Sequence, residues 1–148
     1  MDERRHSDLL GYRVYRTQRM LAQCLEDALA RYGITPGQWN ALNQLDKRGP
    51  LSQRALADAL QRKPATITRS IDKMEEMGLV ERVPDATDRR ANVIVLRPAA
   101  RDLLERIQPD AVDLADRMRE GISDEELALL FRLLDTVYDN ADKAARPL

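Results

Sequence analysis

The chain contains few side chains that could catalyse a reaction or bind a metal ion. Among its 148 residues there is one histidine, His6, and one cysteine, Cys24, and both lie in the N-terminal part. No convincing pair of nucleophile and base can be assembled from them, and no glycine-rich phosphate-binding loop is present. We therefore expect no catalytic residues, no metal site and no cofactor.

The residue types that do indicate a function gather in the middle of the chain. A helix expected from Pro64 to about Met77 carries its apolar residues on one face and polar residues on the other. Short or bidentate side chains near the N-terminal end of such a helix suit the base edges of a DNA major groove. We expect DNA contacts from this face, at Ala65, Thr66, Thr68, Arg69 and Lys73. The alternative is an ordinary solvated helix face.

A second group of cations follows in a short polar turn. Asp88, Arg89 and Arg90 lie between two strand-like runs, Leu79 to Val83 and Val93 to Leu96, where cations have no packing role. Arginine at the tip of such a hairpin can enter a narrow minor groove, steadied by a neighbouring carboxylate. We expect these three residues to contact DNA, although a solvated turn is the simpler alternative.

Four further polar residues flank the expected recognition helix. Ser52 and Gln53 begin the preceding short helix, and Arg62 and Lys63 form the break before Pro64. We expect all four to contact the DNA backbone.

The charge distribution is compatible with this interpretation. The net charge is −1, but residues 1–61 carry +2, residues 62–101 carry +3 and residues 102–148 carry −6. Such asymmetry can place a basic face on DNA. An acidic, solvated C-terminal helix would explain the numbers equally well.

Eight elements are needed to hold these residues, in the order four helices, two strands and two helices. The helices are expected from about Asp8 to Tyr32, from Thr35 to Gly49, from Ser52, from Pro64, from Pro98 and from Ser123. Thr35 with Gln38, and Ser123 with Glu126, have the spacing of capping boxes. Pro109 is expected to kink or split the fifth helix. The fold class is therefore mainly α with a small β-hairpin wing, a winged helix-turn-helix flanked by terminal helices.

The terminal helices carry wide apolar faces that one copy of the chain would leave exposed. We expect residues 1–34 and 98–148 to form a helical dimerisation region around residues 35–97, the winged helix-turn-helix module, within one structural unit. The predicted partner is a second copy of the chain. The alternative is that these helices pack on their own module.

The sequence resembles the MarR (multiple antibiotic resistance regulator) family. The resemblance rests on four segments in order, Gly33–Trp39, Thr66–Arg69, Glu75–Arg82 and Asp85–Arg90, and covers roughly residues 10 to 140. It implies a homodimer, recognition helices in successive major grooves, wings in the flanking minor grooves, and Asp88 holding Arg89 or Arg90. Leu96–Ala100 departs from the usual Leu-Thr-x-x-Gly pattern, and the lost threonine removes a helix N-cap worth roughly 1 kcal/mol. Arg97 in that segment is a candidate phosphate contact.

The resemblance also implies control by a small molecule, because many relatives release DNA on binding an aromatic acid. Tyr12, Tyr15, Arg16 and Trp39 could form a pocket for a small aromatic or phenolic effector, with plain core packing as the alternative. Some relatives sense peroxide through a cysteine near the start of their first helix. Cys24 lies well into the expected helix, and we expect it to act as a small buried hydrophobe.

These observations predict a sequence-specific regulator, a repressor, that binds double-stranded DNA as a homodimer on a pseudo-palindromic operator and is released by an effector. The alternatives are a winged-helix module that binds protein and a redox-responsive regulator that uses Cys24. No run of apolar residues approaches the ~18 that a membrane-spanning helix needs, and residues 1–6 lack the apolar stretch of a signal peptide. We expect a cytoplasmic protein without membrane contact.

Overall fold

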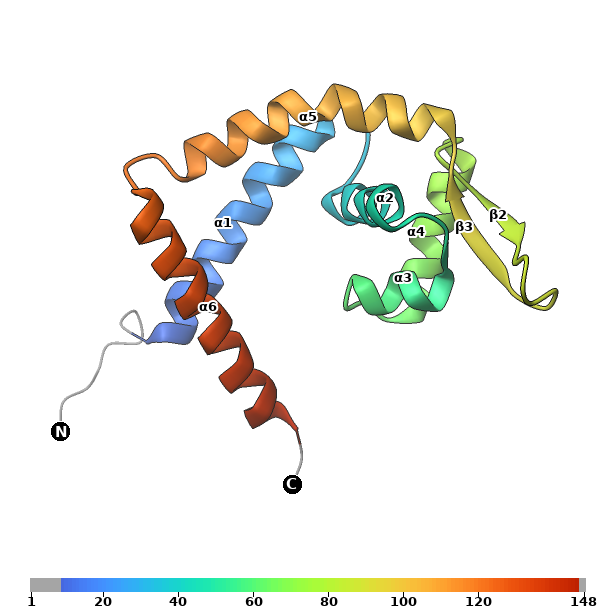
Figure 1. Ribbon diagram of the computed structural model, residues 1–148. Helices are drawn as coiled ribbons and strands as arrows, with labels where there is room; N and C mark the ends of the chain where they lie inside the picture. The colour runs from blue at the N-terminus through green and yellow to red at the C-terminus, as the bar shows by residue number, and fades with distance from the viewer. Residues whose placement is uncertain (1–8, 147–148) are drawn as a thin grey trace. The chain divides into compact units, whose positions relative to one another are not determined.

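A computed structural model describes residues 9–146 of the chain, so His6 lies outside the described residues. It divides into two compact units at Ala111 and Val112. The helices and strands follow one another in the order α1 (Leu10–Ala30), α2 (Pro36–Arg48), β1 (Leu51–Ser52), α3 (Gln53–Ala59), α4 (Pro64–Glu76), β2 (Val80–Pro84), β3 (Asn92–Leu96), α5 (Pro98–Met118) and α6 (Asp124–Ala145) (Figure 1). This order confirms the predicted winged helix-turn-helix with flanking helices.

Local capping signals explain where two of the helices begin. The Thr35 side chain accepts a hydrogen bond from the Gln38 N–H (3.2 Å), and the Gln38 side chain accepts one from the Thr35 N–H (3.0 Å). Ser123 and Glu126 make the same reciprocal pair at the start of α6. Both predicted capping boxes are confirmed, since each depends only on residues three positions apart.

The first unit is built around one hydrophobic core. Residues of α2, α3 and α4 meet the sheet and the first half of α5 there, and Leu42, Leu56, Ile71, Met74 and Ala100 are completely buried. Ile67, Ile71 and Met74 are the buried residues of α4, as the helical periodicity predicted. The core therefore fixes which face of α4 points outward.

The sheet contains one strand more than the sequence predicted. Its order is β1-β3-β2, and all pairings are antiparallel. β1 has only two residues, paired as Leu51 with Ile94 and Ser52 with Val93. So short a strand has no periodicity of its own and exists only because β3 lies beside it. Figure 1 shows the β2–β3 hairpin extending away from the helices that pack on it.

Pro109 does not split α5, which runs from Pro98 to Met118 as one helix. Beside this proline, two residues that directly follow α1 contact α5. The Tyr32 hydroxyl donates a hydrogen bond to the carboxylate of Asp110 and lies 3.2 Å from the carbonyl oxygen of Arg106. Arg31 adds an ion pair with Asp110 (2.9 Å). The hydrogen bond raises the pKa of Tyr32 above its ordinary value.

The apolar stripe predicted on α1 is largely exposed. Leu29 is its only buried residue within the described part of the chain, and Leu25 is partly buried against the core. Leu10, Val14 and Leu21 are exposed. Cys24 is half-buried in the same helix. The exposure of the first half of this stripe is what the sequence led us to expect of a single copy of the chain.

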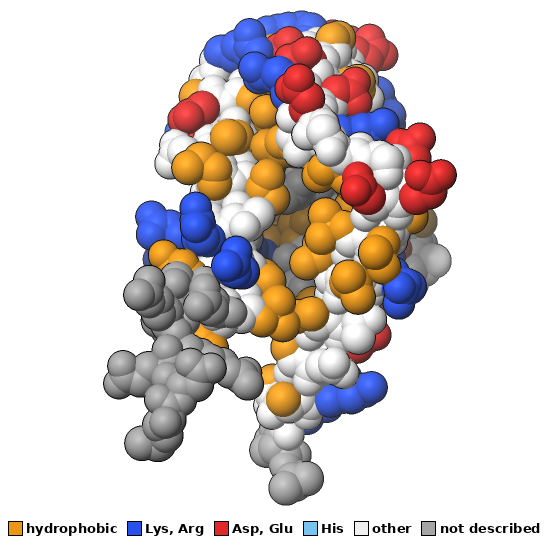
Figure 2. All heavy atoms as spheres, turned by 90° about the vertical axis from the view of Figure 1, so that its left-hand side faces the viewer, with side chains coloured by type: hydrophobic (Ala, Val, Ile, Leu, Met, Phe, Trp, Pro, Cys, Tyr) orange, Lys and Arg blue, Asp and Glu red, His pale blue; other side chains and the backbone are white. Residues whose placement is uncertain are grey.

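In the second unit, α6 has no buried residue. Most of its large apolar side chains are exposed, and Phe131 and Tyr138 are 56% and 57% exposed. Figure 2 shows how many hydrophobic side chains reach the surface on the face of the molecule that it presents. None of the helices in the described part of the chain combines the length and the hydropathy that spanning a membrane requires.

Candidate nucleic-acid interface

The outward face of α4 carries the residues that the sequence singled out. Ala65, Thr66, Arg69 and Lys73 are exposed, and Thr68 is half-buried. The three buried residues of the helix hold this face in place from behind. α4 begins at Pro64 after the non-helical Lys63, which makes no side-chain cap. The structure thus brings all five predicted recognition residues onto one helix with their accessible atoms in solvent.

A cationic cavity of about 480 Å³ adjoins this face. Arg62, Arg69 and Lys73 supply its charge, and Thr66 and Ser70 supply hydroxyl groups. Residues at the start of α2, among them Thr35 and Gly37, form the opposite wall. The positive charge on this surface suits a polyanion such as a nucleic-acid backbone.

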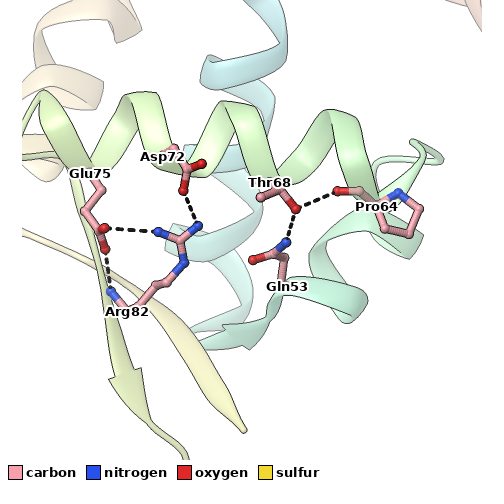
Figure 3. A network of polar contacts seen from close by, with 6 residues as sticks. All are labelled: Gln53, Pro64, Thr68, Asp72, Glu75 and Arg82. Atoms are coloured by element: carbon pink, nitrogen blue, oxygen red, sulfur yellow. Dashed lines mark hydrogen bonds and ion pairs between the residues drawn. The ribbon is translucent and has the colours of Figure 1, made fainter.

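The two residues at the start of α3 both have hydrogen-bond partners within the protein. The Ser52 hydroxyl accepts a hydrogen bond from the Ala55 N–H (3.0 Å) and thereby caps α3. The Gln53 amide donates to the Thr68 hydroxyl, which in turn donates to the carbonyl oxygen of Pro64 (3.0 Å). Figure 3 shows this chain of contacts linking α3 to the first turn of α4. Arg62 and Lys63, in contrast, are exposed in the turn.

The wing tip is shaped by two aspartates that bond the backbone of their own turn. Asp85 Oδ1 accepts hydrogen bonds from the Thr87 N–H (2.9 Å) and the Thr87 hydroxyl (3.0 Å). These bonds lower the pKa of Asp85. Asp88 Oδ1 accepts one from the Arg90 N–H (2.9 Å). Such local bonds are typical of aspartate in turns, and they give the tip its conformation.

Arg89 and Arg90 are both exposed at this tip. The resemblance implied that the Asp88 carboxylate holds one of the two guanidinium groups. Among residues 9–146 this carboxylate instead accepts a hydrogen bond from the main-chain N–H of Arg90. Asp88 and Arg90 are two residues apart, so this bond fixes the backbone of the turn. The Asp88 carboxylate therefore orients Arg90 through its main chain and not through its guanidinium group.

Arg82 connects the wing to α4, a role that the sequence analysis did not assign. Its Nη2 lies 2.6 Å from Asp72 Oδ1 and its Nη1 lies 3.0 Å from Glu75 Oε1. Its main-chain N–H also donates to Glu75 Oε2 (3.1 Å). Figure 3 shows the guanidinium group of Arg82 between these two carboxylates. The sequence shows acidic residues before Gly78 and an arginine after it. It does not show that the chain reverses at Gly78 and so brings Arg82 beside Asp72 and Glu75.

Arg97, the candidate phosphate contact, directly follows β3, at the end of the hairpin away from the wing tip. It is half exposed, and its Nη1 is 3.6 Å from Glu81 Oε2. The pair is loose enough to leave the guanidinium group accessible.

The four residues of the predicted effector pocket do not come together. Tyr12, Tyr15 and Arg16 line a hollow of about 500 Å³ on α1, together with Arg19, Met20 and Gln23. The Arg19 guanidinium lies 5.8 Å from the centre of the Tyr15 ring. Trp39 packs against the hydrophobic core instead, as the core-packing alternative expected. Within the described part of the chain, no cluster of three or more metal-binding side chains occurs.

Comparison with known proteins gives a consistent assignment. Residues 32–91 match the model of the MarR family. The HTH-type transcriptional repressor IacR of Pseudomonas putida is 26% identical over 141 residues, which cover 95% of this chain and 84% of that protein. The chain is similar in sequence over nearly its whole length to a transcriptional repressor.

Solved structures agree in fold as well as in sequence. A probable transcriptional regulator from Pseudomonas aeruginosa is 28% identical with a TM-score of 0.83, covering 90% of this chain and 99% of that one. The repressor CouR, bound to a 23-mer DNA duplex, is 26% identical with a TM-score of 0.84, covering 93% of this chain and 98% of that one; CouR comes from Rhodococcus jostii RHA1. The chain is thus similar to the MarR family over residues 32–91, and to transcriptional regulators of the same winged helix-turn-helix fold over 90% or more of its length.

Proposed function

We propose that the protein is a homodimeric, sequence-specific repressor that binds double-stranded DNA. The observation that carries this proposal is the outward face of α4, where Thr66, Arg69 and Lys73 are exposed over a fully apolar buried face. In this proposal α4 enters the major groove, and Arg69 contacts base edges with help from its neighbours. The DNA-bound CouR structure supports this proposal by its similarity in fold.

The wing complements the helix in this arrangement. Asp85 and Asp88 give the tip a defined conformation that presents Arg89 and Arg90 to solvent. Inserted arginines are favoured where the minor groove is narrow and its potential most negative. In this proposal Arg62 and Lys63, which are exposed beside α4, contact phosphates, and Ser52 donates its hydroxyl proton to one.

We propose a second copy of the chain as the partner of the exposed apolar helices. α1 exposes Leu10, Val14 and Leu21, and α6 exposes Leu130 and Leu134. Apolar surface of this extent is rarely left in water. The two helices also differ in charge, since α1 has three arginines and two acidic residues, whereas α6 has six acidic and two basic residues. A two-fold dimer would place two α4 helices on one pseudo-palindromic operator.

We also propose that the hollow on α1 binds a small aromatic or phenolic acid that releases the DNA. Tyr12 and Tyr15 provide ring surfaces and Arg16 a cation, the combination that such an anion needs. CouR, of the same fold, has been solved with p-coumaroyl-CoA. Titration calorimetry with salicylate tests this idea, with Arg16→Ala as the variant and Lys47→Ala as the control. An absence of heat with the wild type would remove the hollow as a candidate.

The deciding experiment measures DNA binding by fluorescence anisotropy at several salt concentrations. Fragments from the region upstream of the gene are compared with scrambled DNA, and specific regulators typically prefer their site by about 10³-fold or more. Arg69→Ala is expected to cost about 1–3 kcal/mol and to relax the preference at one position. Arg117→Ala, at the C-terminal end of α5, serves as the control. Equal and weak binding to both DNAs, together with an empty genome-wide selection, would contradict DNA recognition and favour a module that binds protein.

A further inference from the structure

The Thr68 hydroxyl is already committed within the protein. A threonine hydroxyl has one proton to donate and two lone pairs to accept with. Here the proton goes to the carbonyl oxygen of Pro64 (3.0 Å), and one lone pair accepts from the Gln53 amide. The hydroxyl therefore cannot also donate a hydrogen bond to a base.

This commitment restricts which base edges the residue can recognise. The major-groove edges of guanine, and the O4 atom of thymine, offer only acceptors, which the occupied hydroxyl cannot satisfy. The methyl group of Thr68 has no such commitment. The residue is half-buried at the flank of the outward face of α4, so part of it remains accessible there.

Gln53 keeps Thr68 in this state from a separate helix. Its amide comes from the first turn of α3, and the carbonyl oxygen of Pro64 comes from the first turn of α4. Held at both sides, the hydroxyl sets the side-chain rotamer, and the methyl group then has one orientation. Figure 3 shows the hydroxyl oxygen directed toward Pro64 and Gln53.

We propose that Thr68 is a specificity residue that recognises the 5-methyl group of thymine through its own methyl group, and that Gln53 is the positioning residue that enforces this mode. The proposal rests on the proposed function, because it requires α4 to lie in a major groove. Contact between a small apolar group and the thymine methyl is an established form of base readout.

The test replaces each thymidine of a selected operator by deoxyuridine, which lacks only the 5-methyl group. With wild-type protein, one position per half-site is expected to lose affinity by about fourfold, the change for one buried methyl contact. Thr68→Ser keeps the hydroxyl and removes the methyl, so it should bind the thymidine and deoxyuridine operators equally at that position. Thr68→Val replaces the hydroxyl by a second methyl group, and because valine has one strongly preferred χ1 rotamer in a helix without any partner, it should preserve the discrimination. Thermal melting checks that both variants fold.

Gln53→Met removes the amide donor at similar size. It should reduce the discrimination between thymidine and deoxyuridine at the same position, a readout that a general loss of stability does not change. Two outcomes would overturn the inference: discrimination that persists in Thr68→Ser, or discrimination that is lost in Thr68→Val while that variant folds. A wild-type protein that binds no operator specifically would instead contradict the proposed function itself.

Discussion

Asp85 determines the conformation of the wing tip through an ionised carboxylate. The two hydrogen bonds from Thr87 favour the charged form and lower the pKa of Asp85 below its ordinary value. A lowered pKa means that the stabilisation is present above the ordinary pKa of aspartate and is lost as the pH falls through the lowered value. The tip should therefore stay ordered at neutral pH and loosen only in acid.

This expectation can be measured on the Thr87 amide by NMR titration. Its chemical shift should follow the protonation of Asp85, with a midpoint below that of an aspartate in an unfolded peptide. Asp85→Asn should remove the titration and weaken DNA binding without changing the core. A midpoint at or above the peptide value would contradict the role given to these hydrogen bonds.

Much at the scale of single residues could be predicted from the sequence. Ala65, Thr66, Arg69 and Lys73 are exposed because Ile67, Ile71 and Met74 are apolar at helical spacing, and that pattern is local. The links from Gln53 to Thr68 and from Arg82 to Asp72 could not be predicted. Each joins residues of different elements, and their separation in space depends on how those elements pack.

At the scale of elements, Arg82 joins the recognition helix to the first strand of the wing. It bonds two carboxylates of α4 by its side chain and one of them again by its backbone, and the side chain is only 24% exposed. Hydrogen bonds between charged, partly buried groups contribute more than exposed ion pairs do. We infer that the helix and the wing move as one body because of this residue.

Arg82→Met is therefore expected to lower the free energy of unfolding by about 1–3 kcal/mol. Arg97→Met is the matched control, because Arg97 lies on the same hairpin in a single, half-exposed ion pair that is worth at most about 1 kcal/mol. Urea denaturation of both variants measures the difference. If Arg82 couples the two elements, Arg89→Ala should weaken DNA binding less in the Arg82→Met background than in the wild type. Equal effects of Arg89→Ala in both backgrounds would show that the wing acts independently of Arg82.

The elements themselves were predictable where their signals are local. The capping boxes at Thr35 and Ser123 begin α2 and α6 at the expected residues. β1 was missed, since Leu51 and Ser52 become a strand only by pairing with Ile94 and Val93. α5 was expected to kink or split at Pro109, but contacts from Tyr32 and Arg31 at the neighbouring Asp110 accompany an unbroken helix.

At the scale of the whole molecule, the exposed apolar side chains of α6 lead to a testable oligomeric state. Leu130 and Leu134 are 41% and 42% exposed, one helical turn apart. Replacing both by glutamate places charge in the proposed interface and should convert a dimer into a monomer in analytical ultracentrifugation. DNA affinity should fall with it, because a monomer engages only one half-site.

The matched control replaces two residues that are already polar on the same helix. Asp135→Asn and Asp139→Asn change charge without adding any to an apolar surface, and they should leave the dimer intact. A monomeric wild type, or a dimer that survives both glutamates, would contradict the proposed interface.

The sequence by itself determined the type of every element except β1, the capping boxes and the polar face of α4, because each follows from residues within a few positions of one another. It also carried the family resemblance, and residues 32–91 match the model of that family. Only the tertiary structure decided that Trp39 packs on the core, that Arg82 pairs with α4, and that the Thr68 hydroxyl is occupied. These facts depend on distances between residues remote in sequence, which the packing of the core sets and no local pattern encodes.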